Sequence, residues 1–165
     1  MKKINEKKLM IIIMFVVVLI VLLIFGITML FGGAERVATK YAKGMSNFDA
    51  NMIVSLYNDK MIEESYETKD EMVKEFDLMF KQMKDSYFQI LKYDVDSNYK
   101  LYEGNELDYH INALVDYYKI DEKDIKEIRR YTVTFSCSDD GDTREVENKL
   151  NIAKIKNKWY LISTE

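Results

Sequence analysis

Hydrophobic residues form one unbroken block near the start of the chain, from Leu9 to Phe31, in which no residue is charged. As a helix, a block of about 23 residues is about 34 Å long, enough to cross a hydrocarbon core about 30 Å thick. A helix also satisfies its own backbone hydrogen bonds in lipid. The pattern therefore predicts a transmembrane helix over residues 9–31, anchored between Leu9 and Phe31.

The charges before this block predict its orientation. Residues 1–8 contain four lysines and one glutamate, and positive residues beside a membrane helix stay in the cytoplasm. We therefore expect a cytoplasmic tail over residues 1–8 and an extracytoplasmic domain over residues 35–165 of a single-pass membrane protein. A cleaved signal peptide is the alternative, since Gly32 and Ala34 could form a cleavage site. Its hydrophobic region is normally only about 7–15 residues long, which favours retention.

After the block, apolar residues recur every three to four positions and predict helices. The first covers Glu35–Met45 and ends at Ser46–Asp49, which can cap a second, short helix through Tyr57. The third begins at Thr68, where Thr68 and Glu71 fit a capping box. Its apolar face comprises Met72, Val73, Phe76, Met79, Phe80 and Met83.

Alternation of apolar and polar residues then predicts strands, with a helix over Leu107–Tyr118 between the first strand and the others. The first strand runs from Tyr87 to near Ser97-Asn98. The last third begins with alternation from Tyr131 and has turns at Asp139–Asp142 and Asn157-Lys158. Helices followed by antiparallel strands predict an α+β fold, with three to four helices packed on an antiparallel sheet.

Composition excludes several classes of function. The chain has 24 basic and 28 acidic residues, and residues 1–8 contribute four and one of these. The remaining 20 basic and 27 acidic residues give a net charge of −7, which argues against nucleic acid as a partner. The single cysteine, Cys137, cannot form an internal disulfide or a cysteine-based zinc site. We expect no cofactor and no metal.

Several short segments carry a resemblance to a known family. They are the break at Phe48-Asp49, the Ser55-Leu56-Tyr57 segment, the run Tyr118–Asp121 leading into Tyr131–Val133, and the closing Lys156–Ile162. Over residues 35–165 the chain resembles the nuclear transport factor 2-like superfamily, especially small membrane-attached bacterial members, although a cystatin-like domain shares these features. The resemblance implies a curved sheet wrapped round a helix to form a cone with a cavity. The topology is also similar to bitopic scaffold proteins of conjugation and type IV secretion machines.

Aromatic residues and one histidine are the candidates for a cavity wall. They are Tyr87, followed by Phe88, then Tyr93, His110, and Tyr117, followed by Tyr118. Aromatic walls bind apolar or sugar ligands, but tyrosine also suits half-buried strands and helix faces. In an enzyme of the superfamily, His110 would pair with a carboxylate such as Asp108, Asp116 or Asp94. A partly exposed side chain without a role is the simpler interpretation of a lone histidine.

Two further features have a chemical and a structural interpretation. The Asp139–Asp142 cluster could bind calcium, but it lacks the alternating ligands and distant glutamate of a calcium loop and suits a hairpin turn. Cys137 shares a face with Val133 and Phe135, and a buried thiol is inert.

Together these observations predict a membrane-anchored extracytoplasmic binding or adaptor module without catalytic activity. Its expected partners are membrane lipid through residues 9–31, and an envelope protein or a second copy of the chain. One alternative is a subunit of a conjugation or secretion-like envelope assembly, which rests on topology. The other is a cavity enzyme that uses His110 with a carboxylate.

Overall fold

The computed structural model describes residues 16, 33–139 and 141–165. Residues 34–165 form one compact unit, separate from residues 1–33. The predicted cytoplasmic tail and transmembrane helix lie outside the described residues, apart from Val16. In the part of the chain that the structure describes, no helix is long and apolar enough to cross a membrane.

The compact unit has helices first and most of its strands last. The α-helices are α2 (Gly33–Asn47), α3 (Ala50–Val54), α4 (Asp59–Tyr66), α5 (Lys69–Asp85) and α6 (Gly104–Asn112). A π-helical turn η1 (Ala113–Tyr117) and a 3-10 turn η2 (Glu122–Asp124) follow α6. The strands are β1 (Gln89–Val95), β2 (Lys100–Leu101), β3 (Ile125–Asp139), β4 (Asp142–Ile155) and β5 (Lys158–Thr164).

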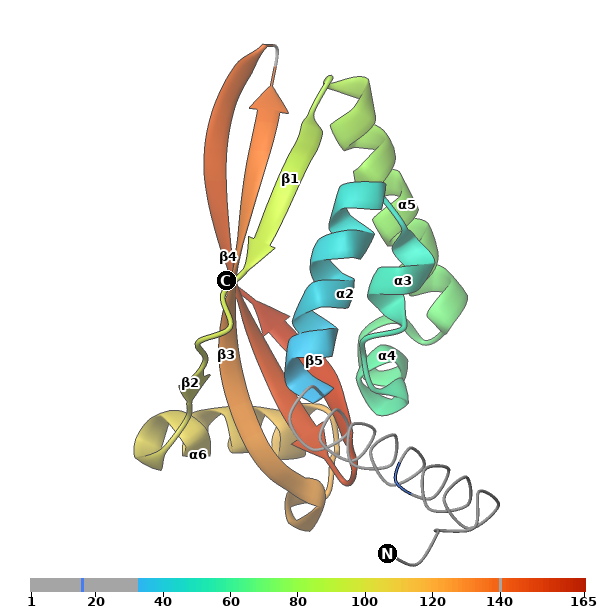
Figure 1. The fold of residues 1–165 in the computed structure, drawn as a ribbon. Coiled ribbons are helices and arrows are strands. Elements are labelled where there is room, and N and C mark those ends of the chain that lie inside the picture. Colours follow the sequence, from blue (N-terminus) through green and yellow to red (C-terminus); the bar gives the residue numbers. More distant parts are fainter. Residues whose placement is uncertain (1–15, 17–32, 140) are drawn as a thin grey trace, which may run out of the picture. The chain divides into compact units, whose positions relative to one another are not determined.

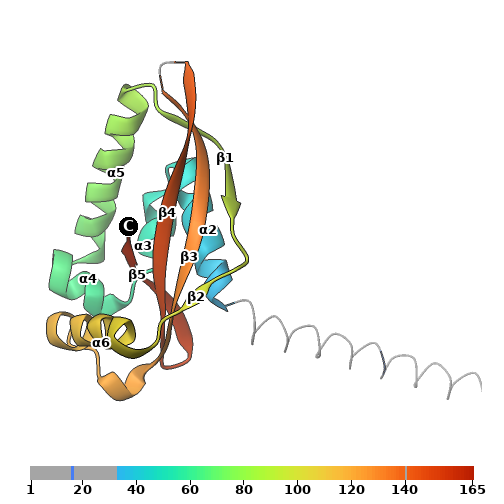
Figure 2. The ribbon, with the colours of Figure 1, turned by 90° about the vertical axis from the view of Figure 1, so that its left-hand side faces the viewer.

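All strands belong to one antiparallel sheet in the order β1-β3-β4-β5, and the short β2 pairs with β3 beyond the end of β1. The long β3–β4 hairpin is its centre and is paired from Ile125↔Ile155 to Asp139↔Asp142. Figure 1 shows α2, α3 and α5 beside one face of the curved sheet, and Figure 2 shows α6 across one end of it. The α+β class and the curved antiparallel sheet are therefore confirmed.

The helix starts follow from side-chain caps. Asp49 accepts a hydrogen bond from the Met52 backbone N–H at 2.9 Å and so caps α3. Thr68 accepts one from the Glu71 N–H at 3.3 Å and caps α5. This is half of the predicted capping box, since the Thr68 N–H donates to the Tyr66 carbonyl and not to Glu71. Asn58 caps α4 through the Lys60 N–H at 3.0 Å. Helix α4 was not predicted from the sequence.

Two hydrophobic clusters hold the helices on the sheet. In the larger one, Val133, Phe135 and Cys137 of β3 are at most 2% exposed and pack with α2 and Phe80 of α5. Ile128 belongs to the second cluster, together with Leu114 of η1. Because side chains alternate along a strand, Ile128 lies on the face of the sheet opposite to Val133 and Phe135. The sheet is thus covered on one face by α2 and α5, and at one end of the other face by α6 and η1.

Strand β3 begins at Ile125, six residues before the predicted alternation at Tyr131. The first part contains Lys126, Glu127 and the Arg129-Arg130 pair. Apolar and polar residues therefore do not alternate in it. Pairing with β4 keeps this part extended, from Ile125↔Ile155 to Arg130↔Asn151. Cross-strand pairing therefore outweighs the local pattern here.

Candidate ligand-binding pockets

One pocket, the tyrosine pocket, has a cavity volume of about 240 Å³ and is built by α4, α5, β5 and the segments that flank α4 and η1. Its walls combine apolar side chains with hydroxyl groups. They comprise Tyr57, Met61, Ser65, Tyr66, Met72, Phe76, Tyr118, Ile162, Ser163 and Thr164. None of these ten residues carries a charge, so a charged ligand would lose its hydration here without gaining an ion pair.

Tyr57 packs against both hydrophobic clusters described above and against a third, which consists of Val54, Ile62 and Met72. Burial raises the pKa of its hydroxyl well above the ordinary 10.0, and the neighbouring Tyr41, Tyr66 and Tyr118 raise it further. The hydroxyl therefore stays protonated. The hydroxyl has no hydrogen-bond partner among the residues that the structure describes. It is consequently available to a molecule in the pocket.

The chemistry of this pocket follows from its two kinds of wall. Met61, Met72, Phe76 and Ile162 offer apolar surface, and sulfur and aromatic groups adapt well to a flat ring or a short chain. Each hydroxyl can donate one hydrogen bond and can also accept one. The arrangement suits a small uncharged molecule with an apolar body and one or two hydrogen-bonding groups.

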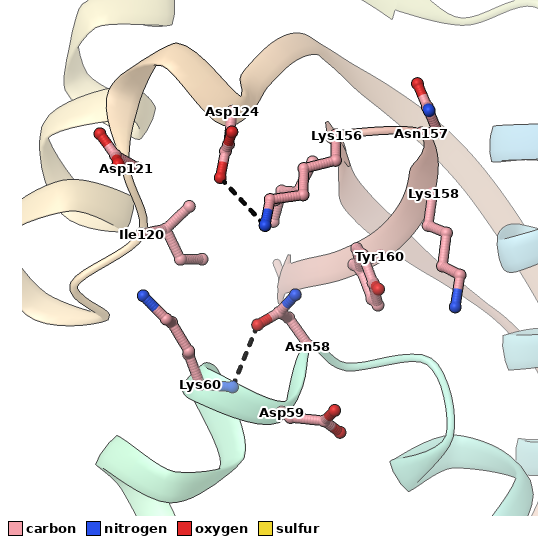
Figure 3. Close-up of a pocket in the computed structure, with 11 residues that line it drawn as sticks. Asn58, Asp59, Lys60, Ile120, Asp121, Asp124, Lys156, Asn157, Lys158 and Tyr160 are labelled. Carbon is pink, nitrogen blue, oxygen red and sulfur yellow. Dashed lines mark hydrogen bonds and ion pairs between the residues drawn. The ribbon is translucent and has the colours of Figure 1, made fainter.

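A second pocket of about 400 Å³ lies near the turn between β4 and β5 (Figure 3). Its walls hold three lysines and three aspartates, namely Lys60, Lys156, Lys158, Asp59, Asp121 and Asp124. Asn58, Asn157, Tyr160, Ile120 and Ile155 complete them. Equal numbers of opposite charges give this pocket no net attraction for an ion of either sign.

Most charged side chains of this second pocket form ion pairs or hydrogen bonds with other groups of the protein. Lys156 Nζ lies 3.4 Å from Asp124, and the Lys156 backbone N–H donates to the Asp124 carbonyl. Lys60 Nζ donates to the carbonyl of Lys119 at 2.9 Å. Asp121 pairs with Lys123 at 2.7 Å, and this hydrogen bond lowers the pKa of the Asp121 carboxyl. These contacts tie η2 to the β4–β5 turn, and α4 to the segment before η2, which is a structural role.

The four predicted cavity residues do not come together at either pocket. Tyr87 is 78% exposed in the turn before β1, and Tyr117 is 63% exposed in η1. Tyr93 lies on the edge strand β1 and is 38% exposed. Tyr118, the neighbour of Tyr117, does line the tyrosine pocket.

His110 lies on α6, with its ring centroid 4.4 Å from that of Tyr102. Burial lowers the pKa of His110, the Arg130 charge lowers it further, and Glu165 and Glu106 oppose this shift. The proposed partners Asp108, Asp116 and Asp94 are all exposed, and none contributes to the shift. Within the described residues, His110 has no carboxylate partner in hydrogen-bond contact, so the acid–base pair is not assembled.

The other two candidates for chemistry, the Asp139–Asp142 cluster and Cys137, lie in surroundings that favour a structural role. Asp139 and Asp142 pair with each other at the β3–β4 turn, where Gly141 has a φ of 92°. Among the described residues, no group of three or more potential metal ligands occurs. Cys137 is 1% exposed, and burial raises the pKa of its thiol.

Comparison of the chain with protein-family models, with curated proteins and with solved structures finds no match. The resemblance to the nuclear transport factor 2-like superfamily therefore stays a prediction from the sequence.

Most of the tyrosine pocket was not predicted from the sequence. Its walls come from four segments between Tyr57 and Thr164, so no spacing along the chain marks them. One local signal existed: Asn58 followed by Ile62 and Tyr66 at helical spacing predicts α4, the helix that contributes Met61, Ser65 and Tyr66 to the pocket.

Proposed function

We propose that this chain is a non-catalytic binding module, held at a membrane by residues 9–31, whose domain takes up a small uncharged molecule in the tyrosine pocket. The observation that carries the proposal is the unbonded Tyr57 hydroxyl in a pocket whose walls have no charged side chain. A binding role agrees better with the surroundings of His110 than the enzyme alternative does, since the pairing that an acid–base mechanism needs is missing there.

The ligand class can be tested with phenol, an uncharged ring with one hydroxyl, and with benzoate, a charged ring of similar size. We expect phenol to raise the melting temperature of the full-length chain in detergent, because a ligand that binds only the folded state stabilises it. Benzoate should do so much less, because the pocket has no cation to replace its hydration. An equal shift by both compounds would contradict the uncharged ligand class.

A variant that fills the tyrosine pocket tests whether phenol binds there. Ser65 lines the pocket from α4, whereas its neighbour Glu64 does not. Ser65→Trp should fill the space and abolish the phenol shift, while Glu64→Trp, a matched control on the same helix, should keep it. Tyr57→Phe should weaken phenol binding by about two- to tenfold, because one hydrogen bond contributes about 0.5–1.5 kcal/mol. Retention of the full shift in Ser65→Trp would place binding elsewhere.

A further inference from the structure

Strand β1 has an open edge. It pairs with β3 on one side, and in the described part of the chain no strand pairs with its other side. Figure 2 shows β1 at the margin of the sheet, away from α5. Large apolar side chains lie along it: Leu91 is 55% exposed and Tyr93 38%. An exposed edge of this kind is a template for a further strand.

The backbone N–H and C=O groups of successive β1 residues point alternately to β3 and to the open edge. The Asp96 N–H donates to the Thr132 carbonyl on β3 at 3.0 Å. In an antiparallel pair, alternate residues direct both backbone groups to the partner, so Asp94 and Lys92 also face β3, opposite Thr134 and Ser136. Tyr93 and Val95 therefore direct their N–H and C=O groups away from β3, where a second strand could bond them.

The charges of β1 are complementary to those of a second β1. If a two-fold axis passes between Tyr93 and Tyr93 of another copy, antiparallel pairing places Lys92 opposite Asp94 in both directions. Moving the axis to Lys92 or to Asp94 would place like charges opposite each other. In the favoured register these two residues form non-hydrogen-bonded pairs, in which side chains approach most closely.

We propose that β1 pairs with β1 of a second copy of this chain, across a two-fold axis at Tyr93, and so joins two sheets into one. The proposal is independent of the tyrosine pocket. Its occupant is a second copy because the Lys92–Asp94 pattern is self-complementary, as a two-fold interface requires.

Cysteine crosslinking tests the register in the full-length chain within membranes. Directly opposed Cα atoms of a hydrogen-bonded pair lie about 5.5 Å apart, which suits a disulfide. Tyr93→Cys should form a covalent dimer on mild oxidation. Tyr109→Cys, at a residue that is 72% exposed on α6, is the matched control and should not. The wild-type chain, with only the buried Cys137, gives the background.

Charge reversal in the Tyr93→Cys background tests the pairing itself. Lys92→Glu or Asp94→Lys creates two like-charged pairs per dimer and should lower crosslinking about tenfold. The combination Lys92→Glu/Asp94→Lys restores both pairs and should restore crosslinking. Lys43→Glu, an exposed reversal on α2, should have no effect.

Three results would each overturn the proposal. The first is a Tyr93→Cys variant that forms no more covalent dimer than the Tyr109→Cys variant. The second is a double charge reversal that crosslinks as weakly as the single reversals. The third is a Tyr93→Cys variant that becomes joined only to a different protein.

Discussion

Asn151 organises the polar side chains at the end of the sheet. It is fully buried, accepts a hydrogen bond from the Tyr102 hydroxyl at 2.7 Å, and donates to Ser163 at 2.8 Å and Glu165 at 3.0 Å. Arg130 completes the group through two hydrogen bonds to Glu165, of 3.0 and 3.1 Å. A buried amide with its donors and acceptors satisfied fixes β3, β4 and β5 in one register.

His110 lies at the border of this network, and its lowered pKa has a consequence for stability. The folded state holds His110 neutral below its ordinary pKa of 6.5. As the pH falls below this value, the unfolded state therefore binds more protons than the folded state does. Stability is therefore fully present above pH 6.5 and is lost as the pH falls through the lowered folded pKa. The main cause is burial, with Arg130 adding to it.

We expect the free energy of unfolding of the full-length chain in detergent to fall between about pH 7 and about pH 5. His110→Phe, which keeps a ring against Tyr102, should show a smaller fall over the same range. His110 is the only histidine in the chain, so the difference between the two proteins isolates its titration. Urea unfolding at both pH values measures it, and identical slopes for the two proteins would refute this assignment.

At the scale of elements, the contact between α2 and α3 depends on Gly44. A Cβ at this position would lie 2.7 Å from Cδ1 of Ile53, a fully buried residue of α3. Alanine is favoured over glycine in a helix by about 1 kcal/mol. Overpacking a core typically costs about 1–3 kcal/mol, so the contact should outweigh the helix propensity.

We therefore expect Gly44→Ala to lower the free energy of unfolding by up to about 2 kcal/mol. Ile53→Val removes the offending Cδ1 and alone costs about 0.5–1.5 kcal/mol. In the double variant the two losses should be less than additive, because the valine relieves the clash. Denaturant unfolding of all four proteins gives the coupling energy. Strict additivity would show that the two residues do not compete for space.

Local signals predicted the elements whose caps and periodicity agree. Thr68 with Glu71 marked the start of α5, and Tyr131 to Cys137 marked the buried face of β3. Residues 125–130 were missed because their strand structure comes from pairing with β4 and not from local pattern. The tyrosine pocket depends on the packing of α4 against α5 and β5, which no single stretch of sequence encodes.

At the scale of the whole molecule, the proposed membrane topology makes a direct prediction. Tyr109→Cys, at an exposed site of the domain, should react with a membrane-impermeant maleimide in intact cells. Lys3→Cys, within the predicted tail, should react only after permeabilisation, because positive residues retain the tail in the cytoplasm. The wild-type chain should give little signal since Cys137 is buried. Labelling of the Lys3→Cys variant but not of the Tyr109→Cys variant in intact cells would show that the topology is the opposite of the proposed one.

The position of the β3–β4 hairpin along the chain has a consequence for synthesis. Helices α2 to α5 leave the ribosome first, but their apolar faces pack largely on β3, β4 and β5, and the first of these strands begins only at Ile125. About 40 residues separate the end of α5 from β3, which is several seconds of translation at about 5–20 residues per second. During this interval the nascent helices have no sheet to cover them. The domain therefore completes its folding late in translation, and a chain truncated before Ile155 exposes the surface that a folding chaperone recognises.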